Sequence, residues 1–146
     1  MKIKNQIPND IQIFGEWLFA RHSIHYIDNL SLNNYLMIFG IYNKNTQMFY
    51  EFNEVQNFCK IYNLSTVPVL TKIKKNQFNE KQLQKFITET AEKVIANGHE
   101  GIVVRNVNSF KYSDFRKNVT KYVRKNHVQT NIHWKQQKII KNELKS

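Results

Sequence analysis

A nearly continuous apolar run over residues 35–42 constrains the fold of this chain more than any other segment. A membrane helix needs about 20 apolar residues, whereas a short run of this kind is typical of a strand buried on both faces. The polar residues 43–45 then predict a turn, after which residues 48–52 would pair back as a hairpin. Imperfect apolar alternation over residues 11–19 predicts a strand before it. The first part of the chain is therefore expected to build a β-sheet.

Helical periodicity follows this hairpin. Asn53 is a candidate N-cap of a short helix that buries Val55, Phe58 and Tyr62. A longer helix is predicted over about residues 80–97, with Gly98 as its C-terminal cap. Its apolar side would consist of Leu83, Phe86, Ile87, Val94 and Ile95. Further short strands are expected at residues 66–70, 102–105 and 119–123, and a last helix around Ile139, Ile140 and Leu144. This order predicts an α+β fold with mixed or antiparallel sheets and flanking helices.

Composition limits the size and the class of the protein. With 146 residues and 41% hydrophobic content, the chain can bury one modest core, so residues 1–146 are expected to form one domain. No Gly-rich loop ending in Gly-Lys-Ser/Thr is present, which excludes a Walker-type phosphate loop. A single cysteine, Cys59, excludes an internal disulfide, and we interpret it as a small buried hydrophobe. The polar start and the lack of any long apolar run predict a cytoplasmic protein without a membrane partner.

Positive charge is concentrated near the end of the chain. Residues 105–146 hold half of the 22 Lys and Arg side chains but only two acids, Asp114 and Glu143. Aromatic residues lie between these cations, and such pairing offers phosphate neutralisation together with base stacking. A solvated basic face that merely aids solubility is the alternative. Because the charge is so concentrated, we favour a surface that binds nucleic acid or nucleotide.

Three ionisable residues lie on or beside short apolar segments. Glu16 follows Gly15, whose missing side chain allows a ligand to approach, and its carboxylate could accept a ribose hydroxyl. Glu100 starts a Val-rich strand and is a hard oxygen ligand suited to Mg²⁺. Lys121 lies in the last predicted strand and could bind a phosphate. Each residue also has a non-functional interpretation, as an exposed acid or as one more lysine in a basic segment. The evidence for a binding site therefore lies in the order and spacing of the three residues along the chain.

That order resembles the motifs of ATP-dependent RNA ligases of the type 2-like branch. Phe-Gly-Glu, ending at Glu16, resembles motif III, and residues 35–41 are similar to motif IIIa. Glu-Gly-Ile-Val-Val-Arg, beginning at Glu100, resembles motif IV, and Lys-Tyr-Val-Arg, beginning at Lys121, resembles motif V. The similarity spans about residues 7–135.

The resemblance implies a nucleotidyltransferase fold, the ATP-grasp-like catalytic domain of ligases. It implies an enzyme that joins RNA 5′-phosphate and 3′-hydroxyl ends through an adenylylated intermediate, using ATP and Mg²⁺. In this chain Phe39 would stack on adenine, Glu16 would hold the ribose, Glu100 would bind the metal, and Lys121 would neutralise phosphate. Glu100 and Lys121 are thus the implied catalytic residues. RNA would be bound by Arg105, Arg116, Lys117, Arg124 and Lys125.

The chain also departs from the family pattern. The family's nucleophile is the lysine of a Lys-x-Asp-Gly motif that precedes motif III, and this sequence contains no such motif. We therefore expect the N-terminal strands of the fold to be missing, so that the chain represents motifs III to V and is inactive alone. Gly40 replaces an acid of motif IIIa, and Val123 replaces the second lysine of motif V.

Several explanations of the missing lysine stay open. A late start codon, a disrupted gene, or a partner chain carrying the N-terminal ligase segment would each account for it. The protein would then be one part of a ligase, or a subunit of a split ligase. The alternative is a non-catalytic RNA- or nucleotide-binding protein derived from a ligase domain. His22 and His25 could suggest a metal site, but two histidines without further ligands are more typical of surface or packing residues.

Overall fold

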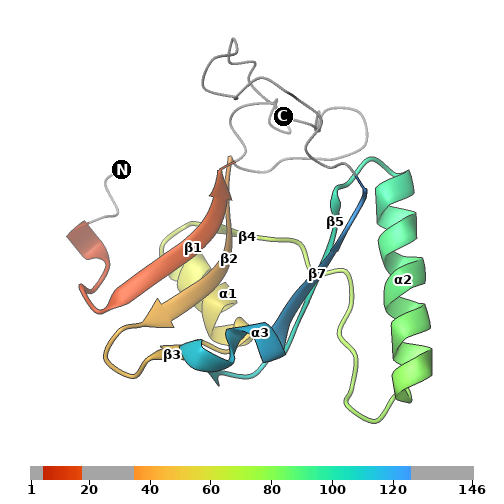
Figure 1. The fold of residues 1–146 in the computed structure, drawn as a ribbon. Helices are drawn as coiled ribbons and strands as arrows, with labels where there is room; N and C mark the ends of the chain where they lie inside the picture. The colour runs from red at the N-terminus through yellow and green to blue at the C-terminus, as the bar shows by residue number, and fades with distance from the viewer. Residues whose placement is uncertain (1–4, 18–34, 126–146) are drawn as a thin grey trace. The chain divides into compact units, whose positions relative to one another are not determined.

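The structure, a computed structural model, describes residues 5–17 and 35–125 (Figure 1). These residues form a mixed α+β arrangement with antiparallel sheets, as the sequence predicted. They fall into two compact units. Residues 5–17, 35–67 and 105–120 belong to the first unit, and residues 68–104 and 121–125 belong to the second.

The first unit is built on a long antiparallel hairpin. Strand β1 (Ile11–Trp17) pairs with β2 (Leu36–Asn43) along its whole length. On its other side β2 pairs with β3 (Met48–Phe49) and, in parallel, with β4 (Ser65–Thr66). Strand β6 (Phe110–Lys111) continues the sheet beyond β3. Only the predicted strands over residues 11–19 and 35–42 thus form long elements.

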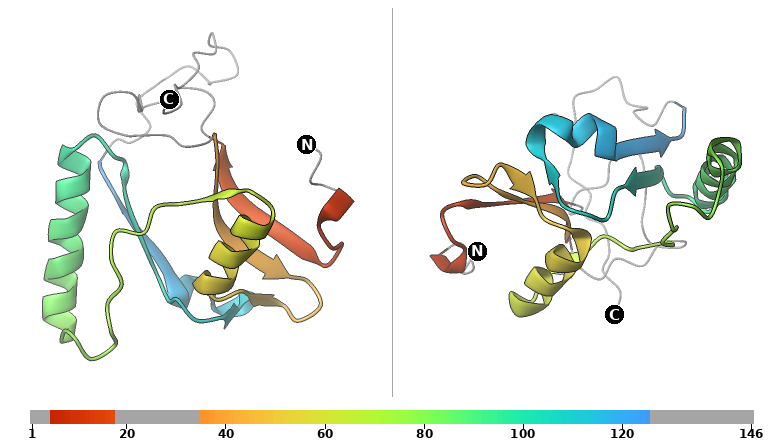
Figure 2. Two further views of the ribbon diagram at one scale, coloured as in Figure 1. Left: turned by 180° about the vertical axis from the view of Figure 1, so that it is seen from behind. Right: turned by 90° about the horizontal axis from the view of Figure 1, so that it is seen from below.

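Helix α1 (Phe52–Ile61) packs on one face of this hairpin, as both views of Figure 2 show. The core consists of Ile38, Ile41, Phe52, Val55 and Cys59, all of which are buried. The interpretation of Cys59 as a buried hydrophobe is confirmed, and burial raises the pKa of its thiol.

Three predicted boundaries around this helix are wrong. Asn53 is not the N-cap, because α1 begins at Phe52 after Glu51, which makes no side-chain capping hydrogen bond. The N–H of Phe52 instead donates to the distant carbonyl of Val107 at 2.9 Å. The predicted strand over residues 48–52 ends at Phe49, since helix α1 already begins at Phe52. Strand β4 ends at Thr66 rather than at residue 70, since Pro68 has no N–H to continue the ladder.

The second unit contains helix α2 (Glu80–Ala96), whose prediction is confirmed. Asn79 accepts from the N–H of Gln82 at 2.8 Å, and the Gln82 side chain accepts from the N–H of Asn79 at 3.1 Å, which completes a capping box. Gly98 ends the helix with a φ of 92°. Ala91 is the fully buried residue of α2, whereas the five predicted apolar residues are half-buried.

Strands β5 (Gly101–Arg105) and β7 (Val119–Val123) confirm the two strands predicted here, and they form a separate two-stranded sheet. Between them lie three elements that the sequence did not predict: β6, a 3₁₀ turn (Tyr112–Asp114), called η2 below, and the short helix α3 (Phe115–Asn118). These elements are too short to show a periodic pattern. The helix predicted around residues 139–144 lies outside the described residues. So do His22 and His25.

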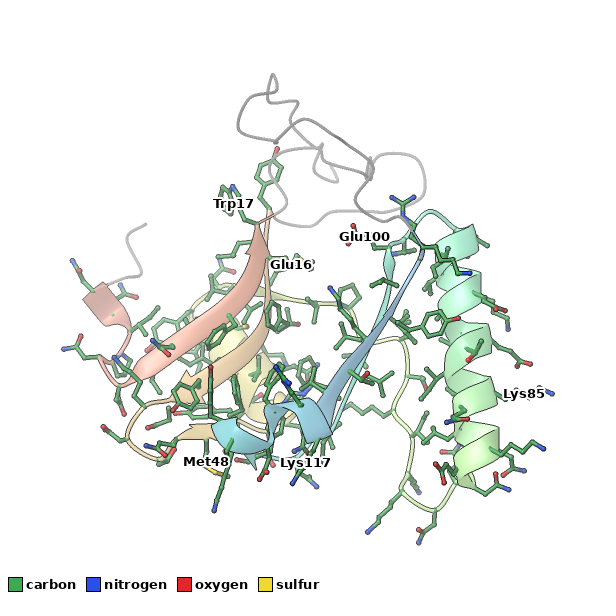
Figure 3. The ribbon with its side chains drawn as sticks, in the orientation of Figure 1. Glu16, Trp17, Met48, Lys85, Glu100 and Lys117 are labelled. Atoms are coloured by element: carbon green, nitrogen blue, oxygen red, sulfur yellow. The ribbon has the colours of Figure 1, made fainter. Side chains whose placement is uncertain are left out.

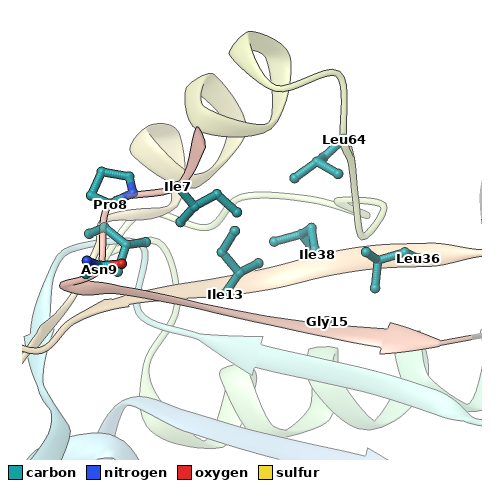
Figure 4. A pocket seen from close by; sticks show the side chains of 9 residues that line it. Ile7, Pro8, Asn9, Ile13, Gly15, Leu36, Ile38 and Leu64 are labelled. Atoms are coloured by element: carbon teal, nitrogen blue, oxygen red, sulfur yellow. The ribbon is translucent and has the colours of Figure 1, made fainter. Parts of the chain in front are cut away.

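An open apolar groove of about 550 Å³ lies along the first unit (Figure 4). Its walls include Ile13 and Gly15 of β1, Leu36 and Ile38 of β2, and Leu64 after α1. It lies on the face of β1 and β2 that carries the core residue Ile38, so it is continuous with the core. None of the described helices is long and apolar enough to cross a membrane.

Candidate functional site

A β-bulge shapes the part of the hairpin that carries Glu16 and Phe39. The pairing of β1 with β2 shifts by one residue, so that Phe14 lies opposite Gly40 but Gly15 lies opposite Ile38. Phe39 is therefore the extra residue of β2. Because of this extra residue, Ile38 and Ile41 can both enter the core while Phe39 stays 40% exposed. The bulge thus turns an aromatic ring out of an otherwise buried strand.

Glu16 lies near this bulge. It pairs with Met37, two residues before Phe39, and its side chain is exposed near the end of β1 (Figure 3). Successive strand residues point to opposite faces, so Glu16 shares a face with Phe14 and not with the core-facing Gly15. A carboxylate and an exposed ring on neighbouring strands can bind a hydroxyl and an aromatic base of one ligand. The structure thus places the two residues implied to bind adenosine on neighbouring, paired strands, and their role in adenosine binding stays a prediction.

Arg105 fixes the backbone at the same bulge. Its guanidinium donates to the carbonyl of Phe39 at 3.2 Å and to the carbonyl of Tyr50 at 3.3 Å, and its Nε donates to the carbonyl of Asn106 at 3.0 Å. It also lies over the rings of Phe52 and Phe110, at 5.3 and 5.4 Å from their centroids. Burial lowers the pKa of Arg105, although an arginine stays protonated at neutral pH. Three donors of Arg105 therefore form hydrogen bonds within the protein. Its implied contact with RNA stays a prediction.

Glu100 belongs to the second unit, just before β5. Its carbonyl accepts from the N–H of Arg124 at 2.9 Å, so Arg124 is its direct cross-strand neighbour. The next residue, Gly101, has a φ of 156°, and a Cβ atom there would lie 1.9 Å from the Tyr122 carbonyl oxygen. Only glycine permits this close approach. The Gly that follows Glu100 in the motif is thus required by backbone packing.

Lys121 lies on the partner strand β7 and is exposed. Since it precedes Arg124 by three residues, strand alternation puts Lys121 and Arg124 on opposite faces. The cation across from Glu100 is therefore Arg124, which the sequence analysis had assigned to RNA alone. Its place as the last residue of the Lys-Tyr-Val-Arg run was the available signal. Next to Glu100, burial lowers the pKa of His99, so this imidazole is favoured in its neutral form.

The remaining implied RNA contacts are exposed or partly exposed. Arg116 and Lys117 lie on α3, and Lys117 is 3.7 Å from Asp114, with 83% of its side chain exposed. An ion pair this exposed is weak, so Lys117 stays available for a phosphate. Lys125 is exposed and Arg124 is half-buried in the second unit.

Within residues 5–17 and 35–125, no group of three or more His, Cys, Asp or Glu side chains could hold a metal ion. Mg²⁺ that is delivered with a nucleotide takes only one or two protein carboxylates, the rest of its ligands being phosphate oxygens and water. Glu100 has the chemistry for such a role. Its part in metal binding remains a prediction.

Comparison with known protein families gave one match. The model of the RNA ligase family matches residues 1–123, which is most of the chain. Neither the comparison with curated proteins nor the comparison with solved structures found a match. The matched residues include the hairpin with Glu16 and Phe39, the strand after Glu100, and Lys121. The chain therefore belongs to the RNA ligase family.

Proposed function

We propose that this chain is the nucleotide- and RNA-binding part of an ATP-dependent RNA ligase domain with the nucleotidyltransferase fold. The observation that carries the proposal is the bulge, which exposes Phe39 on the strand that pairs with the strand of Glu16. An exposed aromatic ring on the strand next to a carboxylate offers a face on which a flat base can stack. Membership of the RNA ligase family supports adenosine as that ligand.

In this proposal the first unit binds the nucleoside. Phe39 stacks on adenine through its exposed ring, and the Glu16 carboxylate accepts a hydrogen bond from a ribose hydroxyl. Arg105 acts as a positioning residue, because it holds the Phe39 carbonyl and so fixes the direction of the ring. Preorganisation of this kind lowers the entropy cost of binding.

The second unit would bind the metal ion and the phosphate groups of the nucleotide. Glu100 is proposed as a Mg²⁺ ligand, and Lys121 neutralises phosphate during adenylyl transfer. Mg²⁺ would supply electrostatic stabilisation of the phosphate groups. The attacking lysine would come from a segment that carries Lys-x-Asp-Gly, a motif that this sequence lacks. That segment, on a partner chain, and the RNA are the proposed partners, and the single buried cysteine fits a reducing compartment such as the cytoplasm.

AMP binding tests the nucleoside site. We expect the chain to bind AMP, and Phe39→Leu to weaken binding about fivefold or more, because leucine keeps the apolar volume but removes the stacking face. Phe39→Tyr should bind nearly as well as the original. Isothermal titration calorimetry provides the measurement. Ile61→Ala is the matched control, since Ile61 is 78% exposed in the same unit but lies at the end of α1.

Glu16→Gln adds a second arm to this test. A neutral amide accepts a ribose hydroxyl less strongly than a carboxylate, so this variant should lose affinity for AMP and discriminate less against deoxyadenosine monophosphate. Equal AMP affinities of the original chain, Phe39→Leu and Glu16→Gln would refute the nucleoside site.

A second candidate function rests on the missing Lys-x-Asp-Gly motif. A chain without a nucleophile can be retained as a non-catalytic binder of RNA or nucleotide. The two functions differ when a related ligase segment with this motif is supplied. A part of a ligase regains adenylylation, whereas a repurposed binder keeps its affinities and gains no activity.

A further inference from the structure

A cluster of aromatic rings surrounds strands β3 and β6 of the first unit. Phe49 lies at its centre, with Phe110 at 5.3 Å, Phe115 at 5.4 Å and Tyr112 at 5.9 Å between ring centroids. Phe49 and Phe110 are each only 6% exposed, as is usual for core residues. Tyr112 is 60% exposed and Phe115 is 38% exposed. The cluster therefore begins in the core and ends at the surface.

The outermost ring of this cluster is held in a defined orientation. Tyr112 is nearly parallel to Phe49, with 12° between the ring planes, and Tyr42 packs against it at 5.5 Å. The N–H of Tyr112 donates to the carbonyl of Gln47 at 3.0 Å, which fixes the start of η2. The Tyr112 ring is thus held in place by Phe49 and Tyr42, while the residue remains 60% exposed to solvent. Such a ring can accept a further flat group without first being ordered.

Positively charged residues lie on both sides of this ring in the sequence. Lys111 precedes Tyr112 on β6, and Arg116 and Lys117 follow it on α3, all three being exposed. The acid between them is Asp114, whose carboxylate lies 3.7 Å from Lys117. The exposed ring is therefore bordered by more positive than negative charge, which favours an anionic partner that carries flat groups.

We propose that Tyr112 is a stacking platform for one base of single-stranded RNA, with Lys111, Arg116 and Lys117 neutralising the adjoining phosphates. This proposal rests on the RNA-binding part of the proposed function and assigns a particular surface to it. A base in a single strand offers a free face to the ring, whereas a base inside a duplex is already stacked on both sides. An acidic peptide would be attracted by the cations but has no need of the ring face.

Three substitutions of Tyr112 separate stacking from packing. Tyr112→Phe keeps the ring, whereas Tyr112→Ala and Tyr112→Leu remove it, and leucine still covers Phe49. With the full chain and a short labelled single-stranded oligoribonucleotide, fluorescence anisotropy should show about fivefold weaker binding or more for Tyr112→Ala and Tyr112→Leu. Tyr112→Phe should bind as the original chain does. Binding to a duplex of the same sequence should not change in any variant.

The salt dependence of the affinity for single-stranded RNA tests the phosphate contacts independently of base stacking. Each phosphate that is no longer neutralised should reduce the log–log slope of affinity for single-stranded RNA against salt by about 0.7, so Arg116→Ala and Lys117→Ala should each flatten it. Tyr112→Leu should lower affinity at every salt concentration and leave the slope unchanged. Lys60→Ala, an exposed lysine of α1 in the same unit, is the matched control and should leave the slope unchanged.

Two outcomes would contradict the platform without contradicting the proposed function. If Tyr112→Leu binds single-stranded RNA as tightly as the original chain while Arg124→Ala and Lys125→Ala weaken binding, the platform is wrong and RNA is bound elsewhere. Equal reductions in affinity for single-stranded and duplex RNA would also overturn base stacking. If the original chain binds no RNA at any salt concentration, the platform and the RNA-binding part of the proposed function both fail.

Discussion

Arg105 joins three segments of the first unit through a single side chain. It binds carbonyls of β2, of the segment after β3 and of its own strand end, and it covers two aromatic rings. Only a guanidinium offers donors in a fixed planar fork that can reach several acceptors at once. Arg105, the last residue of the run that resembles motif IV, therefore stabilises the fold of the first unit. It does so next to Phe39, whose exposed ring is proposed to bind adenine.

Substitution of Arg105 should therefore destabilise the protein. We expect Arg105→Ala to lower the free energy of unfolding by about 1–3 kcal/mol, because it removes a donor from the partly buried carbonyl of Tyr50 and removes two cation–π contacts. Arg105→Lys should recover only part of this stability. Chemical denaturation provides the measurement, and Arg116→Ala is the control, since an exposed arginine should change stability by about 0.5 kcal/mol or less. Equal stabilities of Arg105→Ala and Arg116→Ala would contradict this role.

At the scale of the element, the β1–β2 hairpin combines a bulge with a close approach of the two strand backbones at Gly15. A Cβ atom at Gly15 would lie 2.9 Å from the carbonyl oxygen of Met37 and 3.0 Å from the side chain of Ile38. At Gly40, on the partner strand, the nearest atom would be 3.9 Å away, in Phe14. The glycine beside Glu16 therefore serves strand packing, which is a requirement separate from ligand access.

These distances predict opposite results for two similar substitutions. Gly15→Ala should destabilise the hairpin by about 1–3 kcal/mol, because the added methyl group overlaps the backbone of β2. Gly40→Ala should be close to neutral, because its methyl group meets only ordinary van der Waals neighbours. Thermal unfolding followed by circular dichroism compares the two variants. A larger destabilisation by Gly40→Ala than by Gly15→Ala would show that the hairpin pairs differently.

At the scale of the whole molecule, the proposed ligase residues are divided between two compact units. Glu16, Phe39 and Arg105 lie in the first, and Glu100, Lys121 and Arg124 lie in the second. The chain passes from the second unit to the first at Arg105 and returns after Thr120. In the proposed function, nucleoside binding and phosphate chemistry therefore belong to different units of one chain, and the attacking lysine comes from a further segment.

Adenylylation in trans tests this division of roles. The chain alone should form no covalent AMP adduct with labelled ATP and Mg²⁺. A ligase segment that carries Lys-x-Asp-Gly should become labelled in its presence, as seen by denaturing electrophoresis. Glu100→Ala should abolish or severely reduce this labelling, because it removes the proposed metal ligand while the lysine is present. Labelling of the chain alone would show that another residue of this sequence is the nucleophile.

The sequence by itself determined the α+β class, the two long strands, helix α2 with its C-terminal Gly98 cap, and the family. Each depends on patterns within short segments: apolar runs, helical periodicity, the Gly98 cap and the ligase motifs. Tertiary structure decided the rest. The start of α1, the bulge that exposes Phe39, and the contacts of Arg105 all involve partners distant in sequence, such as Val107 for Phe52 and Tyr50 for Arg105. A local pattern predicts which residues prefer a strand or a helix. The register in which strands pair, and the hydrogen-bond partners of a partly buried charge such as Arg105, depend on which segments meet in space.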